Sequence, residues 1–189
     1  MSAVRFSLPL GPGPVAPRGV PPSGPLHDFP LARSLDGKAD FDRVFRVVRE
    51  AVHRVLGLER PGLGLGLSNL PPSLGAYWQV AGNMIVMNET LVDAMRANAS
   101  STREFNSFVY VILAHEYLHS LGYLGEREVR QVTAQVTLAA FGPEHPATRM
   151  ASGDLWRLYP FLAYARGGDG SRLKVVSRFD LATTQTYIR

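Results

Sequence analysis

The sequence predicts an α+β domain with a small mixed sheet, and three observations support this fold class. Residues 40–58 place apolar side chains at helical spacing. Residues 63–88 hold short apolar stretches of the kind found in strands. Residues 102–121 form a long, mostly apolar segment that is typical of a buried helix. We therefore expect a helix, three or four strands, the buried helix and a following helix, with irregular segments at both ends.

The first 35 residues differ in composition from the rest of the chain, because eight prolines lie among four glycines there. Proline lacks a backbone N–H and has a fixed φ, which excludes such a segment from helices and central strands. We assign residues 1–35 to an extended N-terminal arm and residues 36–189 to the domain. The arm is either a free tail or a segment that packs on the domain and covers a cleft.

The first helix is expected over residues 40–58. Its apolar positions recur every three or four residues from Phe41 to Leu56, with charged residues between them. Gly57 follows the last apolar position, where a glycine commonly ends a helix. This pattern predicts an amphipathic helix with one face on a core.

Strands are expected after this helix. Residues 63–67 alternate leucine and glycine, and a period of two indicates a strand. Residues 75–80 and 84–88 read as a hairpin around residues 81–83. A short helix over residues 89–97 follows the hairpin directly.

The long apolar helix has clear start and stop signals. Ser101 and Glu104 have the spacing of a capping box, in which each side chain accepts a hydrogen bond from a free backbone N–H. Gly122 is placed to close the helix in a left-handed conformation. Glu126 then begins another helical pattern, and carboxylates are favourable at a helix N-terminus.

The last part of the chain carries weaker patterns. Residues 142–146 read as a loop, residues 155–162 as short helices, and residues 173–176 as a strand. We expect this part to cover the core.

The residues that carry chemistry lie near the end of the long helix. His115 and His119 are four residues apart, so their side chains lie on the same helix face and can bind one metal ion together. Glu116 lies about 100° further around the helix and can take a proton from a water molecule without ligating the metal. The alternatives are two ordinary surface histidines or a purely structural metal site. Structural zinc sites usually have four ligands and favour cysteine, which this chain lacks.

The H-E-x-x-H pattern from His115 to His119 resembles the active-site helix of zincin metallopeptidases, and the resemblance extends over about residues 74–138. It implies a zincin-like domain with Zn²⁺ as the cofactor and a peptide or protein as the substrate. It also implies that Glu116 is the general base, which later protonates the leaving amine.

The hairpin adds to this resemblance. Its pattern Gly75-x-Tyr77 followed by Ile85-Val86-x-Asn88 is similar to the edge strand of zincins. In that family the edge strand borders the cleft and pairs with the backbone of the substrate. The resemblance therefore implies an edge strand in this hairpin.

A catalytic zinc site usually has three protein ligands. Glu126 is the first acid after His119, and in position it resembles the glutamate that serves as third ligand in gluzincin-like families. Glu128, Glu144 and His145 remain alternative third ligands.

The site also needs a group that stabilises the developing oxyanion. Tyr123 and His145 are the candidates that we favour, and Tyr117 is a weaker one. Tyr117 points to a different helix face from the two histidines, so we expect it in the core.

Two related families fit less well. Metzincins place a third histidine where this chain has Gly125. The stretch from Leu118 to Tyr123 also resembles the metal motif of a bacterial rRNA-processing endoribonuclease family. That family has glycine in place of Glu116 and again requires histidine at Gly125, so a metal-dependent endoribonuclease is only an alternative. A non-catalytic protein that binds a metal or a partner, its cleft closed by the arm, is another.

Composition limits the other function classes. The chain has no cysteine, which excludes disulfides and thiolate metal ligands. The formal net charge is +4, but the basic residues are scattered, so a nucleic-acid partner is not expected. No apolar run has the length of a membrane span, and the N-terminus makes a poor signal peptide. We therefore expect no membrane partner and a cytoplasmic location.

Overall fold

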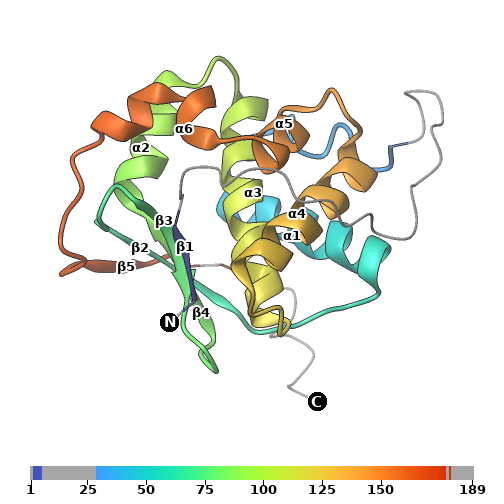
Figure 1. The fold of residues 1–189 in the computed structure, drawn as a ribbon, viewed down its shortest axis with the longest axis horizontal. Helices are drawn as coiled ribbons and strands as arrows, with labels where there is room; N and C mark the ends of the chain where they lie inside the picture. The colour runs from blue at the N-terminus through green and yellow to red at the C-terminus, as the bar shows by residue number, and fades with distance from the viewer. Residues whose placement is uncertain (1, 6–28, 178, 180–189) are drawn as a thin grey trace.

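The computed structural model describes residues 2–5, 29–177 and 179. Most of the predicted N-terminal arm, residues 6–28, lies outside the described residues. The elements follow the predicted order, and the mixed α+β fold class is confirmed (Figure 1).

The sheet has five strands in the order β1-β3-β4-β2-β5. β2 pairs in parallel with β4 and the other pairs are antiparallel, so the sheet is mixed. Four strands lie in predicted segments, and the fifth comes from the segment that we assigned to the arm. The strands are β1 (Ser2–Arg5), β2 (Gly64–Ser68), β3 (Leu74–Trp78), β4 (Met84–Asn88) and β5 (Leu173–Val175).

The predicted edge strand is not at an edge. β4 is central, and β3 is covered by β1, with Ser2 opposite Trp78 and Ala3 opposite Tyr77. The alternation of residues in the hairpin specifies a strand, but the neighbours of a strand depend on segments far away in the sequence. Ser2–Arg5 precedes the first proline, so its backbone can still pair.

Helix α3 lies between the sheet and helices α1, α4 and α5 (Figure 1). It contacts β3 and β4 as well as α1, α4 and α5. The helices are α1 (Phe41–Leu56), α2 (Glu89–Asn98), α3 (Thr102–Ser120), α4 (Glu126–Phe141), α5 (Pro146–Ser152) and α6 (Leu155–Leu158), with a 3-10 helix η1 over Pro160–Tyr164. None of the described helices is long and apolar enough to cross a membrane.

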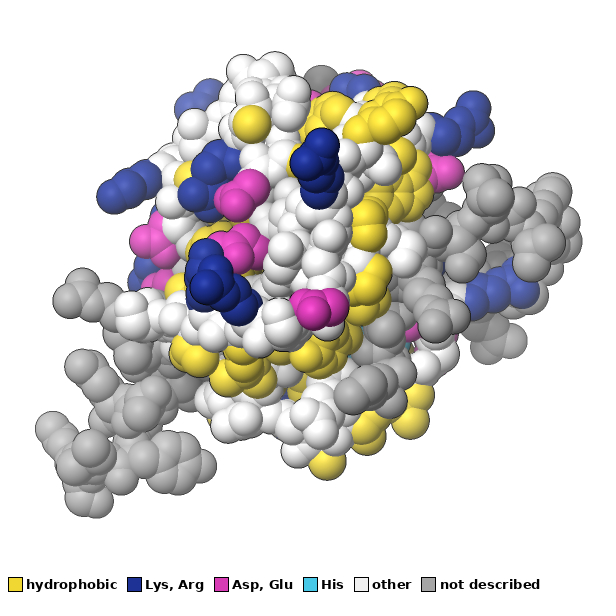
Figure 2. Space-filling view, turned by 90° about the vertical axis from the view of Figure 1, so that its left-hand side faces the viewer, with side chains coloured by type: hydrophobic (Ala, Val, Ile, Leu, Met, Phe, Trp, Pro, Cys, Tyr) yellow, Lys and Arg dark blue, Asp and Glu magenta, His cyan; other side chains and the backbone are white. Residues whose placement is uncertain are grey.

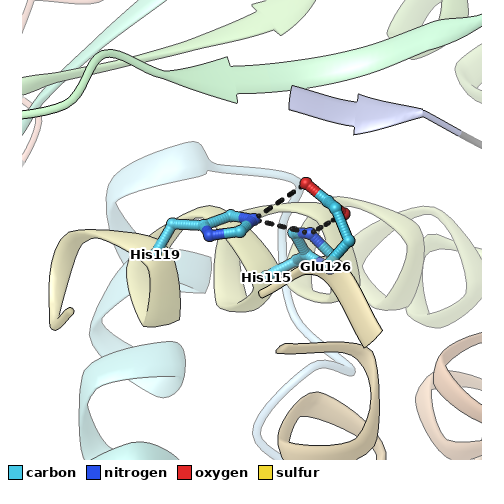
Figure 3. A group of neighbouring side chains, drawn as sticks. All are labelled: His115, His119 and Glu126. Carbon is cyan, nitrogen blue, oxygen red and sulfur yellow. Dashed lines mark hydrogen bonds and ion pairs between the residues drawn. The ribbon is translucent and has the colours of Figure 1, made fainter. Parts of the chain in front are cut away.

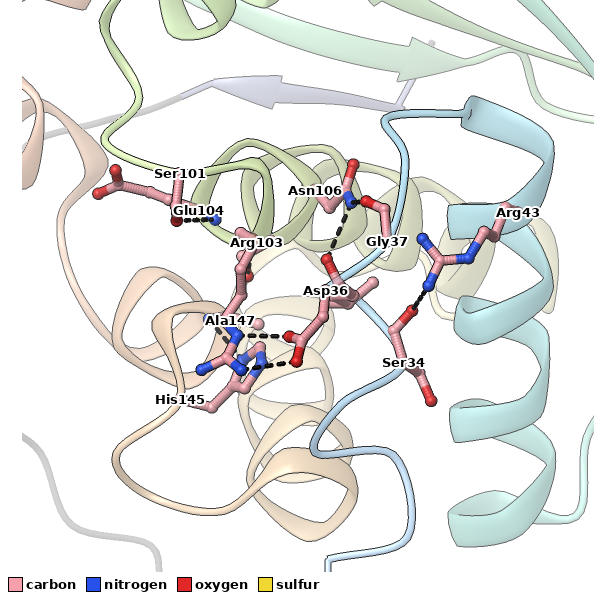
Figure 4. A network of polar contacts seen from close by, with 12 residues as sticks. Ser34, Asp36, Gly37, Arg43, Ser101, Arg103, Glu104, Asn106, His145 and Ala147 are labelled. Atoms are coloured by element: carbon pink, nitrogen blue, oxygen red, sulfur yellow. Dashed lines mark hydrogen bonds and ion pairs between the residues drawn. The ribbon is translucent and has the colours of Figure 1, made fainter.

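The ends of α3 follow the predicted signals. The Ser101 hydroxyl accepts a hydrogen bond from the Glu104 backbone N–H at 3.1 Å (Figure 4). The Glu104 carboxylate accepts one from the Ser100 backbone N–H. Gly122 has φ 102°, which a residue with a Cβ rarely adopts. Every residue of α3 from Phe105 to Ser120 is buried. The polar residues of this helix therefore lie inside the protein, where each needs a partner.

The end of the predicted arm belongs to the folded body. Leu31 and Leu35 are buried in the core, and the Leu31 backbone N–H donates to the Ala140 carbonyl at 3.1 Å. The Asn106 side chain on α3 donates to the carbonyls of Leu35 and Gly37, both at 2.9 Å (Figure 4). Residues 31–35 thus pack on the domain.

Candidate metal centre

Three side chains converge where the end of α3 meets the start of α4. The Nε2 atoms of His115 and His119 are 3.1 Å apart. The two carboxylate oxygens of Glu126 lie 3.3 Å from these nitrogens, one from each (Figure 3). The group is compatible with a metal site. The helix period brings the two histidines together, and the packing of α4 on α3 brings Glu126 to them.

The spacing of these atoms fits a tetrahedral metal ion. Zinc binds nitrogen and oxygen ligands at about 2.0–2.1 Å, which places neighbouring ligand atoms about 3.3 Å apart in a tetrahedral site. The two nitrogens are 3.1 Å apart, close to this value, and each lies 3.3 Å from a different oxygen of Glu126. Two imidazoles and one carboxylate also form a donor set that zinc accepts. The residues present therefore fit the metal that the zincin resemblance implies.

The tautomer of His119 supports a cation at this place. Its Nδ1 atom lies 2.7 Å from the Tyr123 carbonyl oxygen, which can only accept, so Nδ1 carries the proton. In the neutral ring, Nε2 is then an acceptor, and it lies 3.1 Å from Nε2 of His115 and 3.3 Å from a carboxylate oxygen of Glu126. An acceptor nitrogen beside a carboxylate is a place where a cation is stabilised.

The protonation states favour metal binding. Burial disfavours the ionised form of Glu126, but hydrogen bonds with His115 and His119 outweigh it and lower the pKa of Glu126 to about 2. Burial lowers the pKa of His115 below its usual value, although Glu126 opposes this shift. A carboxylate and a neutral imidazole are the forms that bind metals.

Glu116 is the buried acid next to the triad. Its side chain is fully buried, and neither carboxylate oxygen has a hydrogen-bond partner among the described residues. Burial raises the pKa of Glu116 well above its usual value, and the negative charge of Glu126 raises it further. The backbone N–H of Trp78 on β3 opposes this shift without completing a hydrogen bond to the carboxylate. Glu116 therefore faces the space between α3 and the sheet, near enough to the triad to respond to its charge.

The two predicted oxyanion groups, Tyr123 and His145, make other contacts. Tyr123 contributes its backbone carbonyl to His119, and its half-buried side chain packs against the core. His145 precedes α5, where its Nδ1 atom accepts from the Ala147 backbone N–H at 3.1 Å (Figure 4). It lies beside Arg103, twelve residues before His115 on α3, which corresponds to about 18 Å of helix. The structure does not bring His145 to the triad.

The other predicted side chains are also accounted for. Tyr117 is fully buried in the core, as expected, and its hydroxyl accepts from the Arg60 backbone N–H at 2.7 Å. Glu128 and Glu144 are exposed. Neither belongs to the group of ligand atoms formed by His115, His119 and Glu126 among the described residues.

Sequence reasoning missed Arg60. Its guanidinium donates to the Ser120 carbonyl at the end of α3 and to the Gly82 carbonyl in the hairpin turn, at 2.7 and 2.8 Å. It also lies over the Trp78 ring, 5.2 Å from the centroid. Arg60 thus holds β3 against the end of the helix that carries the two histidines. The only signal in the sequence was an arginine in the turn after α1.

Comparisons with family models, with curated proteins and with solved structures found no match to this chain. The resemblance to zincins therefore rests on the motif and on the geometry of the triad.

Proposed function

We propose that the protein is a zinc-dependent metallopeptidase of zincin-like fold. The observation that carries this proposal is the convergence of His115, His119 and Glu126 beside Glu116, a buried carboxylate without a hydrogen-bond partner among the described residues. A structural site needs only the ligands. A hydrolase also needs a base near the metal that does not bind it, and Glu116 suits that role.

Peptide hydrolysis at this site needs residues that bind the metal and a residue that transfers a proton. His115, His119 and Glu126 would hold zinc, which when bound polarises the peptide carbonyl and lowers the pKa of a water molecule. Glu116 accepts a proton as the water oxygen bonds to the carbonyl carbon. It then gives this proton to the amide nitrogen as the C–N bond breaks. Its raised pKa favours the first transfer, because the carboxylate of a weaker acid is a stronger base.

The test compares activity with metal content. The zinc-loaded protein is expected to cleave members of a peptide mixture, and a chelator should stop the cleavage. Glu116→Gln should retain about one zinc ion per chain and lose at least about 100-fold in rate, because a general base contributes about that much or more. Zinc content is measured by mass spectrometry on the same samples. Equal cleavage by both proteins would contradict the proposal.

A second candidate is a zincin-like protein whose cleft stays closed. The pairing of β1 with β3 favours it, because β1 occupies the side of β3 that an extended peptide would use. β1 also contacts α3, the helix that carries the two histidines. This candidate differs from the peptidase in its response to removal of the strand.

The nuclease alternative has less support. On the face shown in Figure 2, lysine and arginine side chains lie among acidic ones. Lys174 on β5, for example, pairs with Glu89 on α2 at 2.6 Å. A nucleic-acid site usually shows basic side chains gathered in one stripe or patch.

A further inference from the structure

Arg60 connects the two sides of the candidate site, and the peptidase mechanism above gives it no role. It lies in the connection between α1 and β2, which runs past the end of α3 (Figure 1). One terminal nitrogen of its guanidinium donates to the Ser120 carbonyl, next to His119, and the other donates to the Gly82 carbonyl in the turn between β3 and β4. The two nitrogens belong to one rigid planar group, so Arg60 fixes the distance between these two carbonyls.

On the helix side, Arg60 holds the peptide unit that begins the turn toward Tyr123. The oxygen of this unit belongs to Ser120, and its N–H belongs to Leu121 and donates to a carbonyl one turn earlier in α3, at 3.1 Å. The unit is therefore bound at both ends. The chain then turns and presents the Tyr123 carbonyl to Nδ1 of His119. Hydrogen bonds of this kind fix the orientation of metal-binding imidazoles.

On the sheet side, Arg60 holds the end of β3. The indole N–H of Trp78, the last residue of β3, donates to the same Gly82 carbonyl at 2.9 Å, and the guanidinium lies over the indole ring. Trp78 is 4% exposed and belongs to the core. Its backbone N–H lies close enough to Glu116 to oppose the rise in the pKa of that carboxyl. The contacts of Arg60 therefore help to set how β3 lies against Glu116.

We propose that Arg60 is a positioning residue, which holds the turn that orients His119 and the strand end that lies against Glu116 in a fixed relation. The inference rests on the proposed peptidase function. Arginine suits this place because its planar fork offers donors in two directions and stacks on an indole ring. A lysine ammonium carries the same charge, but it is a compact group without a planar fork.

The first experiment measures the zinc affinity of metal-free protein by competition with a chromogenic chelator. Arg60→Met keeps an apolar stem and removes both donors, so zinc affinity should fall about tenfold. Arg60→Lys keeps a cation at the C-terminus of α3, where it is favourable, and should unfold less readily than Arg60→Met. Its zinc affinity should nevertheless fall by about the same factor, because an ammonium does not reproduce the bridge between the two carbonyls.

Arg103→Met is the matched control. Arg103 also ties another segment to α3, through its ion pair with Asp36, but it lies at the opposite end of the helix. Arg103→Met should lower the free energy of unfolding and leave zinc affinity unchanged. If Arg60 were only a structural tie, its two variants would give this same result.

The second experiment measures peptide cleavage at saturating zinc. Glu116 acts as bonds form and break, so a shift of β3 against it should lower kcat in both Arg60 variants about tenfold and leave KM nearly unchanged. Arg103→Met should keep the kcat of the wild type per zinc-loaded molecule. A purely structural loss lowers the amount of folded enzyme but not the kcat of each loaded molecule.

The outcomes separate the role of Arg60 from the peptidase function. Unchanged zinc affinity in both Arg60 variants, or unchanged kcat in both, overturns the positioning role while the peptidase function stands. Wild-type zinc affinity in Arg60→Lys alone also overturns it, because charge rather than the bridge would then be sufficient. If the wild type cleaves no peptide, the peptidase function fails, and the zinc affinities alone decide about Arg60.

Discussion

The Nδ1 atom of His119 donates a hydrogen bond to the backbone carbonyl oxygen of Tyr123, at 2.7 Å. The chain reaches this point by turning back at Gly122 with φ 102°. The hydrogen bond fixes the tautomer and the orientation of the ring, so that Nε2 faces His115 and Glu126. Such partners of metal ligands typically change metal affinity 10- to 100-fold when they are lost.

The turn at Gly122 is therefore expected to matter for zinc. Gly122→Ala has space for the new methyl group but strains the backbone, which shifts the Tyr123 carbonyl. We expect zinc affinity, measured by competition with a chromogenic chelator, to fall about tenfold. Gly57→Ala is the matched control, because Gly57 also has positive φ and open space but ends α1. It should lower stability and leave zinc affinity unchanged; equal effects of the two variants would refute the role of the turn.

The third ligand can be tested with two neighbouring acids. Glu126 and Glu128 both lie in the first turn of α4, but only Glu126 joins the triad. Glu126→Ala should lose most of the zinc that the wild type holds, whereas Glu128→Ala should keep about one ion per chain. Mass spectrometry of protein stripped of metal and reloaded with zinc gives the number of zinc ions per chain for each variant. Retention of zinc by Glu126→Ala would remove Glu126 from the site.

His145 predicts a pH dependence of stability. Burial, with a contribution from Arg103, lowers the pKa of His145 to about 4, against an ordinary value of 6.5 in the unfolded chain. The folded state thus favours the neutral ring, whose contribution is present above pH 6.5 and is lost as the pH falls toward 4. His145→Asn keeps a side-chain acceptor for the Ala147 N–H and removes the titration. Urea unfolding in the presence of a chelator should show a smaller acid loss in this variant, and parallel pH profiles would contradict the prediction.

Asn88 predicts a large effect on stability. Its buried side chain accepts from the backbone N–H groups of Leu70 and Thr90 and donates to the carbonyls of Leu70, Pro71 and Leu74. Asn88→Ala leaves these groups without partners and should lower the free energy of unfolding by about 2–4 kcal/mol. Asn98→Ala, at the other end of α2, removes one exposed hydrogen bond and should cost less than about 0.5 kcal/mol. If denaturant unfolding gives similar losses of free energy for Asn88→Ala and Asn98→Ala, the hydrogen bonds of Asn88 do not explain its effect on stability.

The strand β1 predicts a response to truncation. Deletion of residues 2–8 removes β1 and leaves Leu31 and Leu35 in the core, which deletion of residues 1–35 would not. The freed side of β3 can then pair with an extended peptide. We expect kcat/KM for peptide cleavage to rise about tenfold, because fewer molecules have the site occupied by their own strand. Zinc content should stay the same; an unchanged kcat/KM would mean that β1 does not compete with substrate.

Local patterns in the sequence determined much of this protein. The spacing of His115 and His119 places both rings on one helix face, and this result needs only the helix period. The end of α1 at Gly57, the capping box of Ser101 and Glu104 and the hairpin likewise follow from interactions between residues close in sequence. Such interactions do not depend on how distant segments pack, so the order of helices and strands could be predicted.

Only the tertiary structure decided which groups meet at the site. The sequence favoured Glu126 but left Glu128 as an alternative third ligand, and the docking of α4 on α3 brings only Glu126 to the two histidines. The partner of His119 is the backbone carbonyl of Tyr123, which no pattern of side chains in the sequence could indicate. His145 does not reach the triad because it is the N-cap residue of α5. β1 pairs with β3, although the paired residues are about seventy positions apart in the sequence. Contacts of this kind depend on the packing of distant segments against one another, which no local pattern encodes.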